Sequence, residues 1–185
     1  GEVIDIDVTF SEAVTSTGSV TITLETGTTD RTCTFTVSNS TTGTCNYTVA
    51  VGDNTLDLNV SSVSGTIRDE ATNALTNFVP ATNLATNKSL VIDAIPPVIS
   101  SVGSSITNTT STISWSTDKA SSSYVEYGLT SSYGTTTTEI DVDTGVLNHQ
   151  VLLSNLVKCT TYFYRVRSKD SALNPGVGDA SSFST

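Results

Sequence analysis

The sequence has no methionine, one histidine, one tryptophan and only 8 Lys and Arg residues among 185. Because 18 Asp and Glu residues outnumber these bases, the formal net charge is −10, which disfavours binding to nucleic acid and to anionic membranes. No apolar run reaches about 18 residues, so the sequence predicts no insertion into a membrane. It has no signal peptide, and we expect a mature or excerpted segment of a longer precursor.

Motifs that carry chemistry are equally scarce. The single histidine, His149, lies in an alternating run, and there is no nucleophile elbow, P-loop or HExxH motif. Serine is so abundant that a Ser-His-Asp set could be assembled from this sequence by chance. We therefore expect no enzymatic activity and no required cofactor, and we assign no catalytic residue.

Short runs of alternating apolar and polar residues fill the chain instead. Ile4, Ile6, Val8 and Phe10 share one face of such a run, and no segment has a sustained helical period. Turn residues recur roughly every 8–12 positions, which is typical of β-sandwiches. The sequence therefore predicts an all-β fold.

A proline linker divides the chain. Pro96 and Pro97 exclude a central strand or a helix interior at that point, so the backbone runs extended there. An Asp-x-x-x-Asn turn precedes the last strand of each half. We expect two tandem β-sandwiches, formed by residues 1–95 and 96–185.

Residues 97–185 resemble a fibronectin type III domain. The features that carry the resemblance are Trp115, the Tyr124–Gly128 segment, Leu156 followed six residues later by Tyr162 as in a tyrosine corner, and the closing Phe183-Ser184-Thr185. The same residues look like the fibronectin-like domain ahead of the metal domain in purple acid phosphatases. Cys159 departs from the family, which has glycine or another turn residue there.

Residues 1–95 resemble the bacterial Ig-like modules of large surface proteins, and the stretches that carry this resemblance are 8–14, 47–53 and 67–73. The second half opens with a strand at Pro97–Val102 that has no counterpart in the first. We therefore expect the first sandwich to lack its first strand. Either the chain is cut from a longer array, or a neighbouring subunit supplies the strand.

Two of the three cysteines are close in sequence. Cys33 and Cys45 flank a turn and share parity with inward-facing neighbours, so we expect a cross-hairpin disulfide worth about 3 kcal/mol in the chain-entropy model. The alternative is a pair of buried thiols. We expect Cys159 to be a small residue near a corner, with a free thiol or an intermolecular bridge as the alternative.

Hard oxygen ligands gather in two turns and at the linker. The candidates are Asp69, Glu70, Asn73, Asp93, Asp170 and Asn174. Such ligands suit calcium, which would stiffen a junction between modules. The simpler interpretation, which we favour, is that these side chains bond to backbone amides in their own turns.

Charged and glycosylation-competent residues complete the candidates. We expect the basic stripe to pair across strands with nearby acids rather than to bind an anion; these residues are Arg165, Arg167 and Lys169 against Glu126, Glu139, Asp141 and Asp143. The 139–143 run is interpreted as a solvated strand face.

Five asparagines stand in N-x-S/T sequons, namely Asn39, Asn46, Asn59, Asn87 and Asn108. Asn39 is the best candidate acceptor because it is expected at a hairpin tip.

These features predict a non-catalytic structural module of an extracellular or cell-surface assembly, such as a filament subunit, surface stalk or adhesin spacer. Its expected partners are other copies of itself or neighbouring modules of a longer chain. Strand addition, in which a partner contributes a strand to a sheet, is one way in which they would be joined. The alternative is a carbohydrate-binding or spacer module of a secreted hydrolase. Tyr133 and Phe163 are the only aromatic candidates for that alternative.

Overall fold

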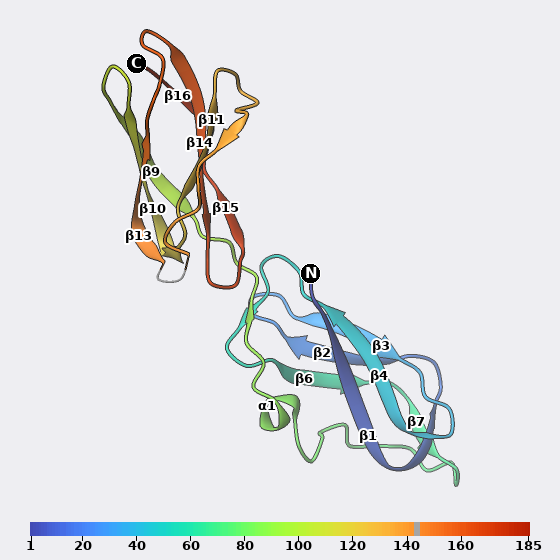
Figure 1. The fold of residues 1–185 in the computed structure, drawn as a ribbon. Coiled ribbons are helices and arrows are strands. Elements are labelled where there is room, and N and C mark those ends of the chain that lie inside the picture. The colour runs from blue at the N-terminus through green and yellow to red at the C-terminus, as the bar shows by residue number, and fades with distance from the viewer. Residues whose placement is uncertain (143–144) are drawn as a thin grey trace. The chain divides into compact units, whose positions relative to one another are not determined.

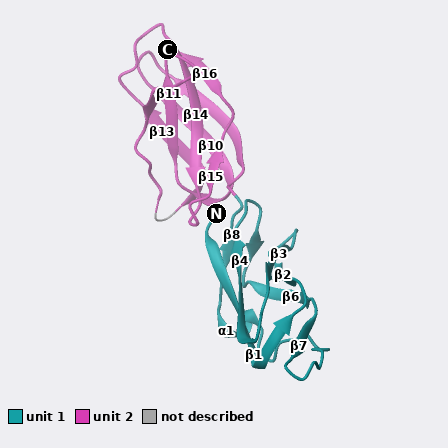
Figure 2. Cartoon of the chain, turned by 90° about the vertical axis from the view of Figure 1, so that its right-hand side faces the viewer, with its two compact units in different colours: residues 1–95 teal, residues 96–185 magenta. Residues whose placement is uncertain are grey.

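The computed structural model describes residues 1–142 and 145–185, and strands make up nearly all of its regular structure (Figure 1). Contacts divide the chain into unit 1, residues 1–95, and unit 2, residues 96–185 (Figure 2). Each unit has a separate hydrophobic core. Among the described residues, no helix is long and apolar enough to cross a membrane. The all-β prediction is confirmed.

Unit 1 consists of two facing three-stranded sheets. Its elements are β1 (Val3–Ser16), β2 (Val20–Glu25), β3 (Arg31–Phe35), β4 (Ser40–Thr48), β5 (Asn54–Thr55), β6 (Asn59–Ser64), β7 (Ile67–Asp69), α1 (Leu84–Asn87) and β8 (Ile92–Asp93). The sheet orders are β4-β1-β7 and β3-β2-β6, and β5 pairs separately with β8. The alternating side chains of β2 are fully buried because they face the other sheet.

Unit 2 has the same two-layer plan. Its strands are β9 (Ile99–Ile106), β10 (Ser111–Ser121), β11 (Tyr124–Gly128), β12 (Thr135–Thr136), β13 (Val146–Leu153), β14 (Thr161–Lys169), β15 (Pro175–Val177) and β16 (Ser181–Ser184). One sheet has the order β13-β10-β9, and the other has the order β12-β11-β14-β15 with β16 also paired to β14. Trp115 and Ile113 of β10 point into the core, as the alternation predicts.

The corner before β14 has the geometry predicted from Leu156 and Tyr162. The Tyr162 hydroxyl accepts a hydrogen bond from the Val157 backbone N–H at 3.0 Å. Its ring stacks on Phe183 with the centroids 5.7 Å apart, and Leu156 is buried beneath. This is the arrangement of a tyrosine corner, in which the hydroxyl ties a strand to the loop upstream.

Some strand predictions are wrong. The alternation of buried side chains does not continue between β4 and β6: Val51 and Leu56 are 82% and 86% exposed, whereas Asp53 between them is buried. The 139–142 segment is not a strand: only Ile140 bridges to Ser123, and Asp141 has a φ of 60°. Asp143, which the same prediction included, lies outside the described residues.

Candidate functional site

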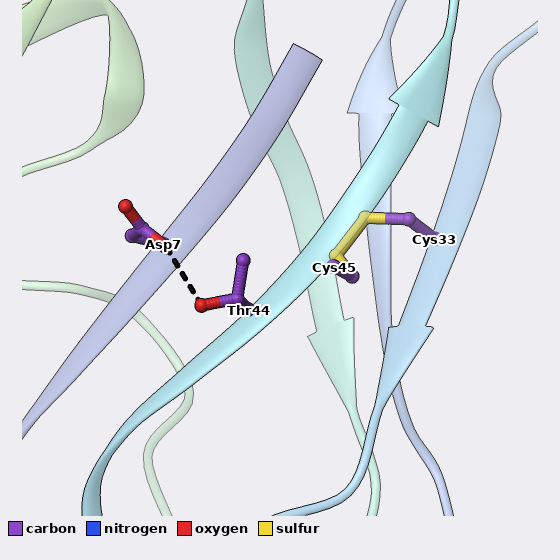
Figure 3. The surroundings of a disulfide bond; sticks show 4 residues. All are labelled: Asp7, Cys33, Thr44 and Cys45. Atoms are coloured by element: carbon purple, nitrogen blue, oxygen red, sulfur yellow. Dashed lines mark hydrogen bonds between the residues drawn. A yellow bond between two sulfur atoms is a disulfide. The ribbon is translucent and has the colours of Figure 1, made fainter. Parts of the chain in front are cut away.

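The disulfide links the two sheets of unit 1. Cys33 lies on β3 and Cys45 on β4, and these strands pair with β2 and β1 respectively rather than with each other. Figure 3 shows the bond crossing between the two layers. The predicted pairing of the cysteines is therefore present, but the expected cross-hairpin geometry is wrong. Cysteines on the two strands of a hairpin and cysteines on two facing sheets both point inward at the same parity, so the sequence pattern fits either arrangement.

A buried carboxylate that sequence reasoning missed lies near the end of β4. Asp53 is 1% exposed and accepts hydrogen bonds from the Tyr47 hydroxyl at 2.7 Å, the Ala50 N–H at 2.8 Å and the Arg31 Nε at 2.7 Å. Burial opposes ionisation of Asp53, but these donors outweigh it and hold its pKa below the usual value. Burial, followed by the bond to Asp53, raises the pKa of Tyr47.

The predicted calcium ligands lie in separate places. Asp69 accepts from both the backbone and side-chain nitrogens of Asn73 at 2.7 Å, and Glu70 beside them is exposed. Asp93 Oδ1 accepts from the Ile95 N–H at 3.1 Å. These carboxylates thus serve the local turns, which is the interpretation that the sequence favoured.

The second predicted turn, in unit 2, is built the same way. Asp170 accepts from Asn174 through the backbone N–H at 2.9 Å and through Nδ2 at 3.0 Å, and Lys119 Nζ lies 3.1 Å away. Across the two ranges that the structure describes, no three His, Cys, Asp or Glu side chains gather as a metal-ligand set. Calcium binding at either turn stays a prediction.

The basic stripe of β14 is paired, as predicted. Glu126 of β11 receives Arg165 Nη2 at 2.6 Å and Arg167 Nη2 at 3.1 Å, while Lys169 Nζ lies 3.0 Å from Glu139. The hydrogen bond from Arg167, followed by the opposing effect of burial and then Arg165, leaves the pKa of Glu126 below its usual value. Paired in this way, the stripe has less positive charge to offer an anion.

Asp141, the remaining described acid of that prediction, faces the core instead. Its carboxylate accepts from the Ser123 hydroxyl at 2.6 Å, and Ser123 Oγ lies 2.8 Å from Nδ1 of His149. On the other side of the ring, Nε2 lies 2.8 Å from Thr117 Oγ1. His149 is 1% exposed and stacks on Trp115, and burial holds its pKa below 6.5 despite the nearby charge of Asp141.

This network has a different order from that of a catalytic triad. In a triad the imidazole lies between the carboxylate and the hydroxyl, whereas here Ser123 lies between Asp141 and His149. The Ser123 side chain is also fully buried. The arrangement satisfies polar groups inside the sandwich and orients the ring against Trp115.

The aromatic candidates for carbohydrate binding lie on unit 2. Phe163 points outward from β14 and is 37% exposed. The Tyr133 ring is covered by the Arg165 guanidinium, 5.1 Å from its centroid. Of these two candidates, Phe163 is the one whose ring is not covered by another side chain.

The modification candidates are mostly accessible. Four of the five sequon asparagines are exposed, namely Asn39, Asn46, Asn87 and Asn108. Asn59 is partly buried, and its side chain accepts a hydrogen bond from the Ala85 N–H at 3.4 Å.

Cys159 is exposed and free. It has a φ of 53°, a left-handed conformation that glycine adopts without steric cost, which explains why a turn residue is expected there.

A hollow in unit 1 lies between the two sheets. A cavity of about 540 Å³ is lined by β1, by β6 and by the 73–84 segment, and its apolar walls include Val8, Phe10, Val63 and Phe78. The neighbouring edge of β1 pairs with β7 only over Val14–Ser16. The expectation that the first sandwich lacks its first strand stays a prediction, and sequence reasoning did not foresee this cavity.

Comparisons with known proteins agree with the architecture of unit 2. Residues 97–185 match the family model of the N-terminal domain of purple acid phosphatase. A comparison with curated proteins finds no match. The resemblance to a fibronectin-like domain is thus supported for the second half, while a bacterial origin for the first half stays a prediction.

Two solved structures are similar over most of the chain. A two fibronectin type III domain segment from chicken tenascin is 13% identical, covers 98% of each chain and has a TM-score of 0.45. The FN1–FN3 domains of chicken CNTN1 are 12% identical, cover 97% of this chain and 61% of that chain, and have a TM-score of 0.38. Both TM-scores are below 0.5. We therefore describe the fold from the strand pairing within each unit.

Proposed function

We propose that this chain is a non-catalytic structural module of an extracellular assembly, such as a filament, stalk or adhesin spacer. The observation that carries the proposal is the disulfide between the sheets of unit 1, placed in a tandem of two sandwiches. Disulfides persist in oxidising compartments and stabilise thin domains with small cores. Such modules maintain spacing and resist unfolding.

The polar surface supports the same proposal. Unit 1 exposes mainly Thr, Ser, Asn and acidic side chains, and the whole chain has a net charge of −10. A surface of this kind stays hydrated and repels anionic membranes and nucleic acid. The family match concerns the N-terminal domain of a phosphatase, and we propose no enzymatic role for the chain.

The alternative is a carbohydrate-binding or spacer module of a secreted hydrolase. Phe163 favours binding because it presents a partly exposed ring on a sheet face. However, Tyr133 is engaged by Arg165, so one uncovered ring would have to provide the stacking surface. This leaves the structural role better supported.

Immunogold electron microscopy of material from the native source tests the proposal. Antibodies against each unit are expected to label regular filaments or surface fibres at repeated spacing. Labelling confined to a soluble enzyme that also carries a hydrolase domain would overturn the structural role in favour of the alternative. Sugar-array binding by the wild type and by Phe163→Ala then distinguishes a binding module from a passive spacer.

Calcium and glycans are secondary parts of the proposal with their own tests. If calcium occupies either Asp-x-x-x-Asn turn, millimolar calcium raises the melting temperature, and Asp69→Asn or Asp170→Asn removes the rise from the unit concerned. An unchanged melting temperature overturns calcium binding. Mass spectrometry of the peptide containing Asn39 from native material decides whether that exposed sequon carries a glycan.

A further inference from the structure

One edge of β1 is open over most of its length. Residues Val3–Thr9 pair with β4 on one side, and β7 reaches the opposite edge only at Val14–Ser16. The Val49 N–H donates to the Glu2 carbonyl, so the alternation of an antiparallel ladder turns the backbone groups of Asp5, Asp7 and Thr9 away from β4. Within the described residues, no strand pairs with these groups.

The open edge borders the cavity of about 540 Å³ between the sheets. Three inward-facing side chains of β1 are only partly buried, namely Ile4, Val8 and Phe10, whereas Ile6 is 3% exposed. On β2, by contrast, Val20 and Leu24 are 0% exposed. Phe78 and Leu84 of the 73–84 segment cover part of this side of the sandwich. The remaining apolar surface of β1 lies beside backbone donors and acceptors that no strand uses.

Unit 2 shows how this chain closes the equivalent place. Its central strand β10 is paired on both sides, with β13 on one edge and β9 on the other. The 8-residue β9 runs antiparallel to β10, and its Ile99 and Val102 pack against the core. An extended segment of similar length would complete unit 1 in the same way.

The acidic side chains of β1 restrict the amino-acid composition of the strand that could pair with it. Asp5 and Asp7 project from the solvent face of β1, and Glu12 is exposed near its bend. Edge-to-edge pairing of two β1 strands would bring these acids opposite one another, which is destabilising. A suitable strand has apolar residues at alternate inward positions and Thr, Lys or Arg outward.

We propose that the open β1 edge and its cavity accept an extended strand of this composition, donated by a neighbouring subunit of the assembly. The donated backbone pairs with Asp5, Asp7 and Thr9, and its apolar side chains fill the hollow next to Val8 and Phe10. This inference rests on the proposed structural function and identifies the partner and its site.

A synthetic nine-residue peptide tests the site on the purified 185-residue chain. It alternates valine with threonine and places lysine at two outward positions. We expect it to raise the melting temperature of unit 1, followed by circular dichroism, by at least about 5 °C at concentrations well above Kd. Trp115 fluorescence, which reports unit 2, stays unchanged. No shift, or an equal shift by a peptide with a central proline, overturns the proposal.

Substitutions of Asp5 provide matched controls. Asp5→Pro removes an N–H that faces the open edge and that β4 does not use, so it is expected to weaken peptide binding at least tenfold. Asp5→Ala keeps the N–H and retains binding. Asp5→Lys favours a peptide with glutamate in place of lysine. Equal binding by the proline and alanine variants would show that the edge is not the site.

Two further experiments identify where the strand comes from and distinguish failure of the acceptor site from failure of the proposed structural function. If the same strand stabilises unit 1 only when it is fused ahead of residue 1, the occupant belongs to the same polypeptide and donation by a neighbour is overturned. If native material forms fibres but the peptide does not bind, the structural function stands and this acceptor site falls. Peptide binding with no native fibres supports the acceptor and overturns the assembly role.

Discussion

Unit 1 and unit 2 keep thin β-sandwiches closed by different means. Unit 1 uses a covalent bond between its sheets and a buried carboxylate at Asp53. Unit 2 uses a tyrosine corner, a stacked Trp115–His149 pair and an ion-paired stripe on β14. The charges divide in the same way: 11 Asp and Glu face 3 Lys and Arg in residues 1–95, against 7 and 5 in residues 96–185.

The difference shows which conditions each unit depends on. With few bases, unit 1 leaves most acids solvated, and the disulfide makes its stability depend on the redox state of the compartment. Unit 2 contains the only histidine, buried in its core, so its stability should depend on pH just below 6.5, above the range in which carboxylates such as Asp53 titrate. The two dependences can be separated because the only tryptophan, Trp115, lies in unit 2.

The largest expected effect comes from removing the disulfide. Replacing Cys33 and Cys45 together with alanine should lower the free energy of unfolding of unit 1 by about 3 kcal/mol, because the unfolded chain regains loop entropy. Circular dichroism in urea should show the loss, while the Trp115 fluorescence midpoint stays in place. Matching shifts in both signals would mean that the units do not unfold independently.

Asp53→Ala should be nearly as damaging to unit 1. It leaves the Arg31 guanidinium, the Tyr47 hydroxyl and the Ala50 N–H without their acceptor, at a cost of about 2–3 kcal/mol. Tyr47→Phe is the matched control and should cost about 1 kcal/mol. Urea titrations decide the point; equal losses for the two variants would show that the carboxylate contributes only through tyrosine.

Acid just below pH 6.5, above the range in which carboxylates titrate, should act on unit 2. The pKa of folded His149 lies below 6.5, so between pH 6.5 and that lower value the unfolded chain binds a proton that the fold excludes. The free energy of unfolding of unit 2 therefore falls as the pH drops, by at most about 1.4 kcal/mol per pH unit. Trp115-monitored urea titrations should show this slope, and His149→Gln should flatten it. A persistent slope in that variant would exclude His149 as its cause.

Tyr162→Phe isolates the corner of unit 2. Losing the bond from the Val157 N–H to the hydroxyl should cost about 1 kcal/mol, with the ring still packed on Phe183. The Trp115 unfolding midpoint measures the loss. Tyr127→Phe, whose hydroxyl has no such bond among the described contacts, should change it less; the reverse ranking would contradict the assigned role.

The smallest effect is a gain. Ser111 Oγ is buried and has no hydrogen-bond partner within the described residues. Ser111→Ala removes an unsatisfied polar atom and should stabilise unit 2 by about 0.5–1 kcal/mol. A calorimetric loss of stability instead would indicate that the hydroxyl is bonded in solution.

Alternation predicted the strands because each sheet buries every second side chain, as Ile113 and Trp115 illustrate. It could not tell which strands pair. Cys33 and Cys45 have the parity of a hairpin and of two facing sheets alike, so the expected cross-hairpin bond was wrong in detail.

Polar contacts between residues far apart in the sequence were the second feature that could not be predicted from the sequence. Asp53 has the sequence context of a surface turn, and only the fold brings Arg31 and Tyr47 to it. Asp141 likewise turns inward to Ser123 because the chain there leaves the strand conformation. The local turns at Asp69 and Asp170 were foreseeable because their partners lie four residues away.

The disulfide also limits how far the polypeptide yields to a pull. Cys33 and Cys45 are 12 positions apart, so the loop between them cannot straighten when force acts through the chain ends. At about 3.3–3.6 Å per residue, roughly 40 Å of contour length stays locked in unit 1 until the bond is reduced. A tether made of such units would lengthen in two stages, with the second released only by a reductant.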